Sequence, residues 1–205
     1  MPSLRPCIAL GLAIVATNAG AEDPFSGALR EVLAATSDQP YAAVVDFSRP
    51  SSEDRFFVVR RSDGAIVFQA HVAHGEGSDP DQVGRVVALS NASGTGASSV
   101  GLYALGERYE GRYGPSMRLD GRAPTNSAAR DRAIVLHAAV YMEPALRARN
   151  GGRDGRSCGC FAMTQGDRDR AFGYLHTGSL MNVVGPAEVA PDSSDLPPAT
   201  CADED

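Results

Sequence analysis

Short apolar runs of strand length, separated by turn and loop residues, dominate the middle of this 205-residue chain. Three such runs follow one another at residues 41–47, 56–60 and 65–72. Ser62-Asp63-Gly64 separates the last two and is typical of a hairpin turn, because glycine accepts the positive φ that such turns need. Four more runs follow, at residues 100–105, 117–120, 133–139 and 179–184. The pattern predicts a mainly β domain over residues 41–185.

Helical patterns are short and lie beside the predicted strands. Residues 22–40 hold apolar side chains at helical spacing after polar residues that can cap a helix, which predicts an N-terminal helix and a linker. Thr164 followed by Asp167 resembles a capping box and predicts a helix that ends near Leu175. Residues 144–149 are long enough for one further short helix.

Two long segments lack any such pattern. Residues 73–99 are rich in glycine, serine and aspartate, and loops of this length are usually functional or disordered. Residues 186–205 contain several prolines and a cluster of acids, which predicts a disordered tail.

Residues 1–21 have the order of features that is typical of a secretory signal peptide. Arg5 supplies positive charge, and the apolar run at residues 7–16 is too short to span a bilayer comfortably. Ala19-Gly20-Ala21 then fits a cleavage site of small residues. We therefore expect export across the inner membrane, most simply to the periplasm, and no stable membrane insertion once the signal is removed.

The overall charge indicates which partners to exclude. The net charge is −6, and nucleic-acid-binding proteins usually present a basic face, so we expect no nucleic-acid partner. All 19 basic residues are arginine, which is typical of a GC-rich bacterial genome.

A cysteine that directly follows a glycine is the main candidate for chemistry. Cys160 ends a glycine-rich loop, and upstream of it His137 ends an apolar run. A thiol and an imidazole are the minimum for covalent cysteine catalysis, because the imidazole can take the thiol proton. The backbone N–H groups of Gly159 and Cys160 could also hold an oxyanion. The alternative from spacing alone is an inert, half-buried cysteine.

The other cysteines leave several pairings open. Removal of residues 1–21 leaves Cys158, Cys160 and Cys201, an odd number in an oxidising compartment, so at least one thiol is left over or pairs between chains. Cys158 can pair with Cys160 or Cys201, although the short loop would strain a bond between residues 158 and 160. The chain lacks a second cysteine pair or a histidine pair at zinc-site spacing, so no metal site is predicted.

Two segments around these residues resemble a known family. Ile134-Val135-Leu136-His137-Ala138 and, further on, Arg156-Ser157-Cys158-Gly159-Cys160 are similar to the catalytic core of the murein L,D-transpeptidases of YkuD-like fold. Their pattern is a strand that ends in histidine, followed by Ser-x-Gly-Cys. Further matching blocks occur in order, at residues 45–52, 72–78, 89–91, 98–103 and 117–121.

The resemblance implies a fold and a set of site residues. The fold is a mainly β, YkuD-like β-sandwich with short peripheral helices. Cys160 would be the nucleophile and His137 the base, which a backbone carbonyl would orient, while Ser157 and Gly159 would shape the turn. The substrate-binding side chains would be Arg156, Arg118, Tyr113 and His74.

The resemblance also implies a reaction. The enzyme would be a cysteine acyltransferase that joins peptidoglycan stem peptides through a thioester, without a metal or organic cofactor. A first alternative is an L,D-carboxypeptidase in which water is the acceptor. A second is a cell-wall binding or redox module that uses Cys158 and Cys160 without catalysis. Ala138 in place of glycine, and Cys158 at the variable position, depart from the family pattern and concern substrate preference.

Overall fold

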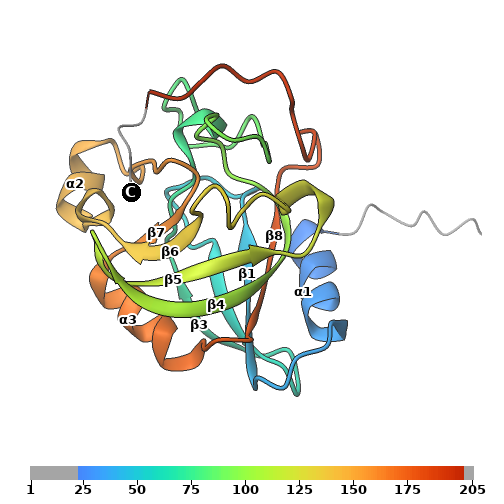
Figure 1. Cartoon of the computed structure of the whole chain (residues 1–205). Helices are drawn as coiled ribbons and strands as arrows, with labels where there is room; N and C mark the ends of the chain where they lie inside the picture. Colours follow the sequence, from blue (N-terminus) through green and yellow to red (C-terminus); the bar gives the residue numbers. More distant parts are fainter. Residues whose placement is uncertain (1–22, 201–205) are drawn as a thin grey trace, which may run out of the picture.

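A computed structural model describes residues 23–200, which form one eight-stranded sheet with short helices around it (Figure 1). The strands are β1 (Tyr41–Asp46), β2 (Phe56–Arg60), β3 (Ile66–Ala70), β4 (Gly101–Gly111), β5 (Gly114–Gly121), β6 (Val135–Ala138), β7 (Phe161–Met163) and β8 (Leu180–Val184). The helices are α1 (Pro24–Ala34), α2 (Pro144–Arg149) and α3 (Gln165–Tyr174), with 3₁₀ turns at Glu76–Ser78, Pro124–Asn126 and Val140–Met142. The predicted mainly β fold with short peripheral helices is confirmed. The predicted signal peptide lies outside the described residues.

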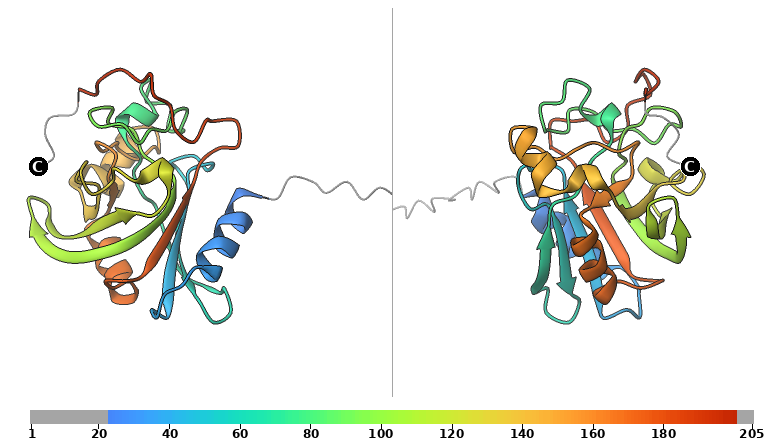
Figure 2. Two further views of the ribbon diagram at one scale, coloured as in Figure 1. Left: turned by 45° about the vertical axis from the view of Figure 1, so that its right-hand side comes forward. Right: turned by 90° about the vertical axis from the view of Figure 1, so that its left-hand side faces the viewer.

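The sheet has the strand order β3-β2-β1-β8-β4-β5-β6-β7. β1 and β8 pair in parallel, as do β6 and β7, and the other neighbours pair antiparallel. The long β4–β5 hairpin curves across the upright strands β1 and β8, so the two halves of the sheet face one another (Figures 1 and 2). The core between them takes buried side chains from both halves, among them Val45, Phe56, Leu119 and Phe161.

Helix α1 covers the outer face of β1 and β8 (Figure 2). It begins where the sequence predicts, because the Asp23 carboxylate accepts a hydrogen bond from the Ser26 backbone N–H at 3.1 Å and Pro24 occupies the first turn. Ala28 and Val32 are buried against the sheet. The short helix is therefore held in place by one apolar face.

Helix α3 contributes to the main core through Ala171 and Phe172. Thr164 caps its start as predicted, since its hydroxyl accepts from the Asp167 backbone N–H at 3.1 Å. The reciprocal bond of a capping box is replaced by one from the Thr164 hydroxyl to the Asp167 carboxylate at 2.8 Å. No helix within residues 23–200 combines the length and the apolar character needed to cross a membrane.

The β4–β5 hairpin is much longer than the sequence pattern predicts. The apolar runs cover only its buried base, whereas the outer part carries exposed side chains such as Glu107, Arg108 and Glu110. This part of the hairpin pairs through its backbone out to Gly111 and Gly114. Strand β7 was missed for another reason: three residues are too few to show a period.

The predicted loop at residues 73–99 is present and carries one 3₁₀ turn. Where the sequence predicts a disordered tail, the described residues 186–200 run back over this loop. The Asp192 carboxylate accepts from the Asn91 backbone N–H at 2.8 Å, and Ser193 N–H donates to the Leu89 carbonyl at 2.7 Å. The loop is therefore packed beneath a second segment of chain.

A buried carboxylate anchors the start of the glycine-rich loop that leads to Cys160. The Asp154 side chain is fully buried and accepts from Arg147 Nε at 2.7 Å. It also pairs with His71 Nδ1 at 3.0 Å. The hydrogen bond that His71 donates to Asp154 raises the pKa of His71, against the lowering effect of its partial burial.

This pairing predicts a pH-dependent contribution to stability. Because the folded-state pKa of His71 lies above its unfolded value of about 6.5, the contribution is full below that pH and is lost as pH rises through the raised pKa. His71→Gln should therefore lower the free energy of unfolding more at pH 6 than at pH 8.5. Urea unfolding of both proteins at the two pH values measures this, and an equal loss at both would contradict it.

Candidate active site

Cys160 and His137 lie on neighbouring chain segments. β6 and β7 pair in parallel with His137 opposite Ala162, and Cys160 directly precedes β7. Both side chains line one cavity of about 270 Å³ beneath the β4–β5 hairpin. The lining residues are Tyr109, Gly111, Arg112, Tyr113, Ser116, Arg118, Ala133, Val135, His137 and Cys160. The structure thus brings together four of the residues that the sequence singles out: the thiol, the imidazole, Arg118 and Tyr113.

The His137 imidazole is arranged as a base. Its Nδ1 lies 3.0 Å from the Ala138 carbonyl oxygen, which can only accept, so Nδ1 carries the proton. Nε2 is buried and has no hydrogen-bond partner among residues 23–200. Burial lowers the pKa of His137, against the opposing effect of the bond to Ala138. At neutral pH the ring therefore presents a lone pair at Nε2.

Tyr113, at the tip of the β4–β5 hairpin, packs against this imidazole. The two ring centroids are 4.8 Å apart and the rings are tilted by 35°. This contact and the Ala138 bond fix the ring from two sides. His137 is only 1% exposed, so little water reaches the ring.

Ser157 and Gly159 shape the turn that presents Cys160. The Ser157 hydroxyl donates to the Cys160 carbonyl at 2.7 Å and accepts from the Gly159 N–H at 3.1 Å. Gly159 has φ +107°, and a Cβ there would lie 2.8 Å from the Ala97 carbonyl oxygen, so only glycine fits. The Gly159 N–H, one of the two groups that could hold an oxyanion, donates to Ser157 in this structure.

Arg132 is a charged neighbour of the thiol that sequence reasoning missed. Its guanidinium donates to the carbonyls of Ser90 and Ala97, in the loop behind Cys160. Burial lowers the pKa of Arg132, while attraction to Tyr103 and Cys160 opposes this effect. A cation held there favours a thiolate at Cys160. Its position just before the apolar run that ends in His137 was the available signal.

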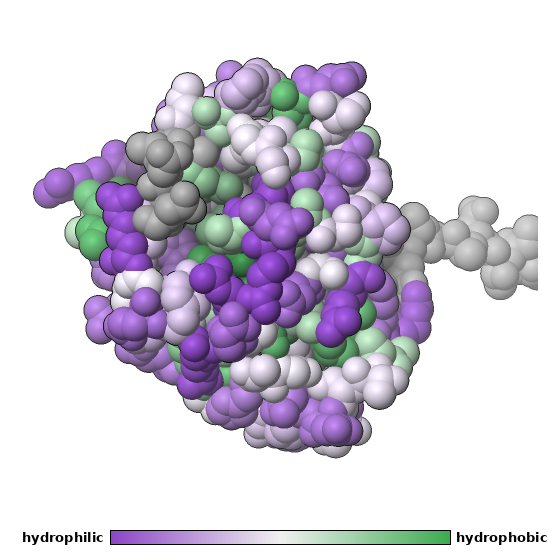
Figure 3. Space-filling model, in the orientation of Figure 1, coloured by the Kyte–Doolittle hydropathy of each residue, from purple (hydrophilic) through white to green (hydrophobic). Residues whose placement is uncertain are grey.

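The alternation of side chains along a strand explains which residues of the β4–β5 hairpin line the cavity. Ser116 and Arg118 are two residues apart on β5 and so share a face, while Met117 between them is buried in the core. Tyr109 pairs with Ser116 across the ladder. In Figure 3 hydrophilic side chains gather over these two strands. Sequence reasoning missed Tyr109, Arg112 and Ser116, because the outer hairpin was not predicted.

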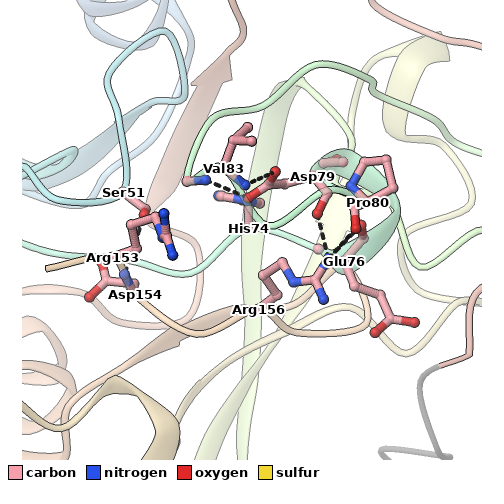
Figure 4. A network of polar contacts seen from close by, with 12 residues as sticks. Ser51, His74, Glu76, Asp79, Pro80, Val83, Arg153, Asp154 and Arg156 are labelled. Atoms are coloured by element: carbon pink, nitrogen blue, oxygen red, sulfur yellow. Dashed lines mark hydrogen bonds and ion pairs between the residues drawn. The ribbon is translucent and has the colours of Figure 1, made fainter. Parts of the chain in front are cut away.

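His74 lies outside this cavity, in a buried polar network (Figure 4). Its Nδ1 accepts from Arg55 Nη2 at 2.8 Å, and its Nε2 lies 3.3 Å from an Asp79 carboxylate oxygen. Burial is the largest effect and lowers the pKa of His74 to about 4, so the ring is neutral and donates to Asp79. Burial also lowers the pKa of Arg55 to about 10, which leaves it charged at neutral pH. This geometry favours a structural role for His74 over contact with substrate.

Arg156 is also placed away from the cavity. Its Nη1 donates to the backbone carbonyls of Glu76, Asp79 and Pro80 (Figure 4). It lines a separate polar hollow of about 190 Å³. The structure therefore uses this arginine to hold the glycine-rich loop against residues 76–80.

The His74 segment supports the Cys160 turn through its backbone. Ser157 N–H donates to the His74 carbonyl at 3.0 Å, and Glu76 N–H donates to the Ser157 carbonyl at 2.7 Å. Ala73 N–H continues this pairing to the Ala162 carbonyl at 2.8 Å. Residues 73–76 thus run beside β7 and fix the loop that carries the thiol.

The two cysteines of the motif are in different chemical states. Cys158 is disulfide-bonded, whereas Cys160 carries a thiol. They are therefore not bonded to each other, and the pairing of Cys158 with Cys160 that the sequence left open does not occur in this structure. The Cys160 thiol, which no disulfide occupies, donates to the Ala133 carbonyl at 3.8 Å.

The chemical inventory of the cavity is a nucleophile, a base and cations. Within residues 23–200, no cluster of three or more His, Cys, Asp or Glu side chains is arranged to hold a metal ion. The polar cavity groups are the Cys160 thiol, the His137 imidazole, two guanidinium groups, two phenols and a hydroxyl. This set suits attack of a thiolate on a carbonyl, with the imidazole as the proton carrier.

Comparison with known proteins gives one family match and several similar solved structures. A family model described as an L,D-transpeptidase catalytic domain matches residues 22–183. One similar solved structure is an L,D-transpeptidase from Mycobacterium smegmatis, with 11% identity and a TM-score of 0.45 over 71% of this chain and 59% of that chain. Another is an L,D-transpeptidase from Stackebrandtia nassauensis, with 15% identity and a TM-score of 0.44 over 82% of this chain and 68% of that chain. An Enterococcus faecium L,D-transpeptidase mutant has 10% identity and a TM-score of 0.44 over 71% of this chain, which spans 50% of that protein.

The search of curated proteins found no match. The resemblance stated from the sequence is nonetheless confirmed by the family model, which covers most of the chain and includes both His137 and Cys160. The chain belongs to the L,D-transpeptidase catalytic-domain family.

Proposed function

We propose that this protein is a secreted cysteine acyltransferase that joins peptidoglycan stem peptides by L,D-transpeptidation. The observation that carries the proposal is that Cys160 and His137 line one cavity, with a lone pair at His137 Nε2. Family membership supports the reaction class. The expected export to the periplasm rests on the signal-like order of residues 1–21.

The proposed reaction has two acyl transfers. His137 Nε2 takes the Cys160 thiol proton, and the thiolate attacks the carbonyl carbon of the L-centred third residue of a donor stem. Collapse of the tetrahedral intermediate breaks the C–N bond, and the imidazolium returns the proton to the departing D-amino acid. An amine on a second stem then attacks the thioester, loses a proton to His137 and releases the Cys160 sulfur.

A covalent adduct tests the nucleophile. Purified protein treated with a carbapenem or a tetrapeptide stem should gain the mass of one acyl group on Cys160. The adduct should vanish in Cys160→Ala, and in Cys160→Ser it should form far more slowly, because a hydroxyl is the weaker nucleophile at neutral pH. Mass spectrometry of intact and digested protein measures both. An adduct that persists in Cys160→Ala would overturn the assignment.

The acceptor is tested by the products. With a tetrapeptide donor and an acceptor amine, transpeptidation gives a cross-linked or exchanged stem, whereas an L,D-carboxypeptidase gives the shortened tripeptide with or without the amine. A redox module would instead lose its redox response in Cys158→Ala and keep that response in His137→Ala. The acyltransferase predicts a larger loss of activity in His137→Ala than in Cys158→Ala.

A further inference from the structure

The cavity is cationic although the protein as a whole is acidic. Its lining includes Arg112 and Arg118 and contains no aspartate or glutamate among the described residues, while the chain has a net charge of −6. His137 adds no negative charge in either protonation state. A cavity of this sign attracts an anionic group of a substrate.

Arg118 is held in a fixed position at the edge of this cavity. Its guanidinium carbon lies 4.3 Å from the centre of the Tyr109 ring, a cation–π contact that orients the guanidinium plane. Its Nε lies 3.5 Å from a Glu107 carboxylate oxygen. A β-bulge creates this contact, because Gly106 and Glu107 of β4 stand opposite Arg118 of β5.

Glu107 contacts Arg118 at Nε, while Arg130 holds the same carboxylate more closely. Both Glu107 carboxylate oxygens accept from Arg130, at 2.8 and 3.0 Å, and these bonds lower the pKa of Glu107 to about 2. Among residues 23–200, the contacts of the Arg118 guanidinium are the Nε–Glu107 ion pair and the Tyr109 ring, and neither occupies the N–H groups of Nη1 and Nη2. Two parallel N–H donors therefore remain for a ligand.

We propose that Arg118 is a carboxylate receptor, which binds an acidic group of the donor stem while Cys160 attacks. This inference rests on the proposed function. A guanidinium edge matches a carboxylate through two parallel hydrogen bonds, which a neutral amide cannot reproduce. A donor stem offers two such groups near the reacting carbonyl: the terminal carboxylate of the leaving residue and a side-chain carboxylate on the third residue.

Three tetrapeptide stems distinguish these sources: one with both carboxylates, one with an amidated C-terminus, and one with an amidated third side chain. For the wild-type protein, one amidation should lower kcat/KM for Cys160 acylation by about 10- to 100-fold, the usual effect of losing a charge-assisted pair. The amidation that does so identifies the carboxylate. Equal rates for all three peptides would overturn the proposal.

Variants separate recognition from structure. In Arg118→Gln the preference for acid over amide should fall to nearly one, and Arg118→Lys should restore part of it. Arg122→Gln, an exposed arginine outside the cavity, should keep the full preference. An Arg118→Gln variant that slows acid and amide peptides equally would indicate a structural role only and would overturn the inference.

Binding measured without turnover separates this inference from the proposed reaction. Calorimetric titration of the three peptides into Cys160→Ala should rank their affinities in the same order as their acylation efficiencies in the wild-type protein. Adding Arg118→Gln to Cys160→Ala should make the three affinities nearly equal. If no acyl adduct forms yet the ranking holds, the reaction is wrong and the carboxylate site stands. If adducts form without any ranking, the reaction stands and the carboxylate site is wrong.

Discussion

Replacing His137 with glutamine should lower the rate of Cys160 acylation by about 10²- to 10⁴-fold, the range expected when a general base is removed. Glutamine is close to histidine in size and can still donate to the Ala138 carbonyl, but it offers no basic nitrogen where Nε2 stands. The protein should therefore stay folded and keep its thiol while losing the means to deprotonate it. Stopped-flow acylation with a carbapenem measures the rate.

The pH profile of the wild-type protein provides a second measure of the same residue. Burial lowers the pKa of His137, so the base stays neutral below the ordinary value of about 6.5, and the acylation rate should fall only at more acidic pH. His137→Gln should lack this acidic limb. His176→Gln, at an exposed histidine outside the cavity, should retain both rate and profile. A His137→Gln rate within a factor of a few of wild type would rule out His137 as the base.

The strands that sequence pattern located well are those buried on both faces. β1 is buried along nearly its whole length and β2 over its first four residues, and the pattern placed both within a residue of their observed bounds. The outer β4–β5 hairpin escaped because its stability comes from backbone pairing and from contacts such as Arg118 over Tyr109, which have no apolar period. Apolar periodicity in a sequence indicates a buried face, and an exposed hairpin buries few side chains.

The same distinction explains which site residues the sequence brought out. The roles of Cys160 and His137 could be predicted from the chemistry of the motif. The parallel neighbours β6 and β7, the last two strands in the sheet order, then bring the two residues together. Arg156 is adjacent to the motif in sequence, yet it turns away to the carbonyls of residues 76–80. That loop has no period from which its path could be predicted. Arg118, the other arginine expected to bind substrate, does line the cavity.

Gly75→Ala should be the most disruptive small substitution near the active site. Gly75 has φ −71°, which any residue can adopt, so its backbone alone does not require glycine. Space does: an added Cβ would overlap the Gly96 carbonyl oxygen and lie 2.9 Å from both Cα and N of Gly159. These are backbone atoms that cannot rotate away. The substitution should lower the free energy of unfolding by about 1–3 kcal/mol or more, as overpacking does in a tightly packed interior.

The same substitution should also slow catalysis, because the displaced neighbour is the residue before the nucleophile. Relief of the overlap requires residues 73–76 to move away from the Cys160 turn, which would weaken the bonds that Ser157 makes to this segment. Urea unfolding and the acylation rate, measured on the folded fraction, should therefore both decline. Gly173→Ala in α3 is the matched control: its Cβ would meet nothing within 4 Å, and the change should be neutral or stabilise by up to about 1 kcal/mol. A Gly75→Ala protein as stable and as reactive as Gly173→Ala would show that the 73–76 segment does not hold the catalytic turn.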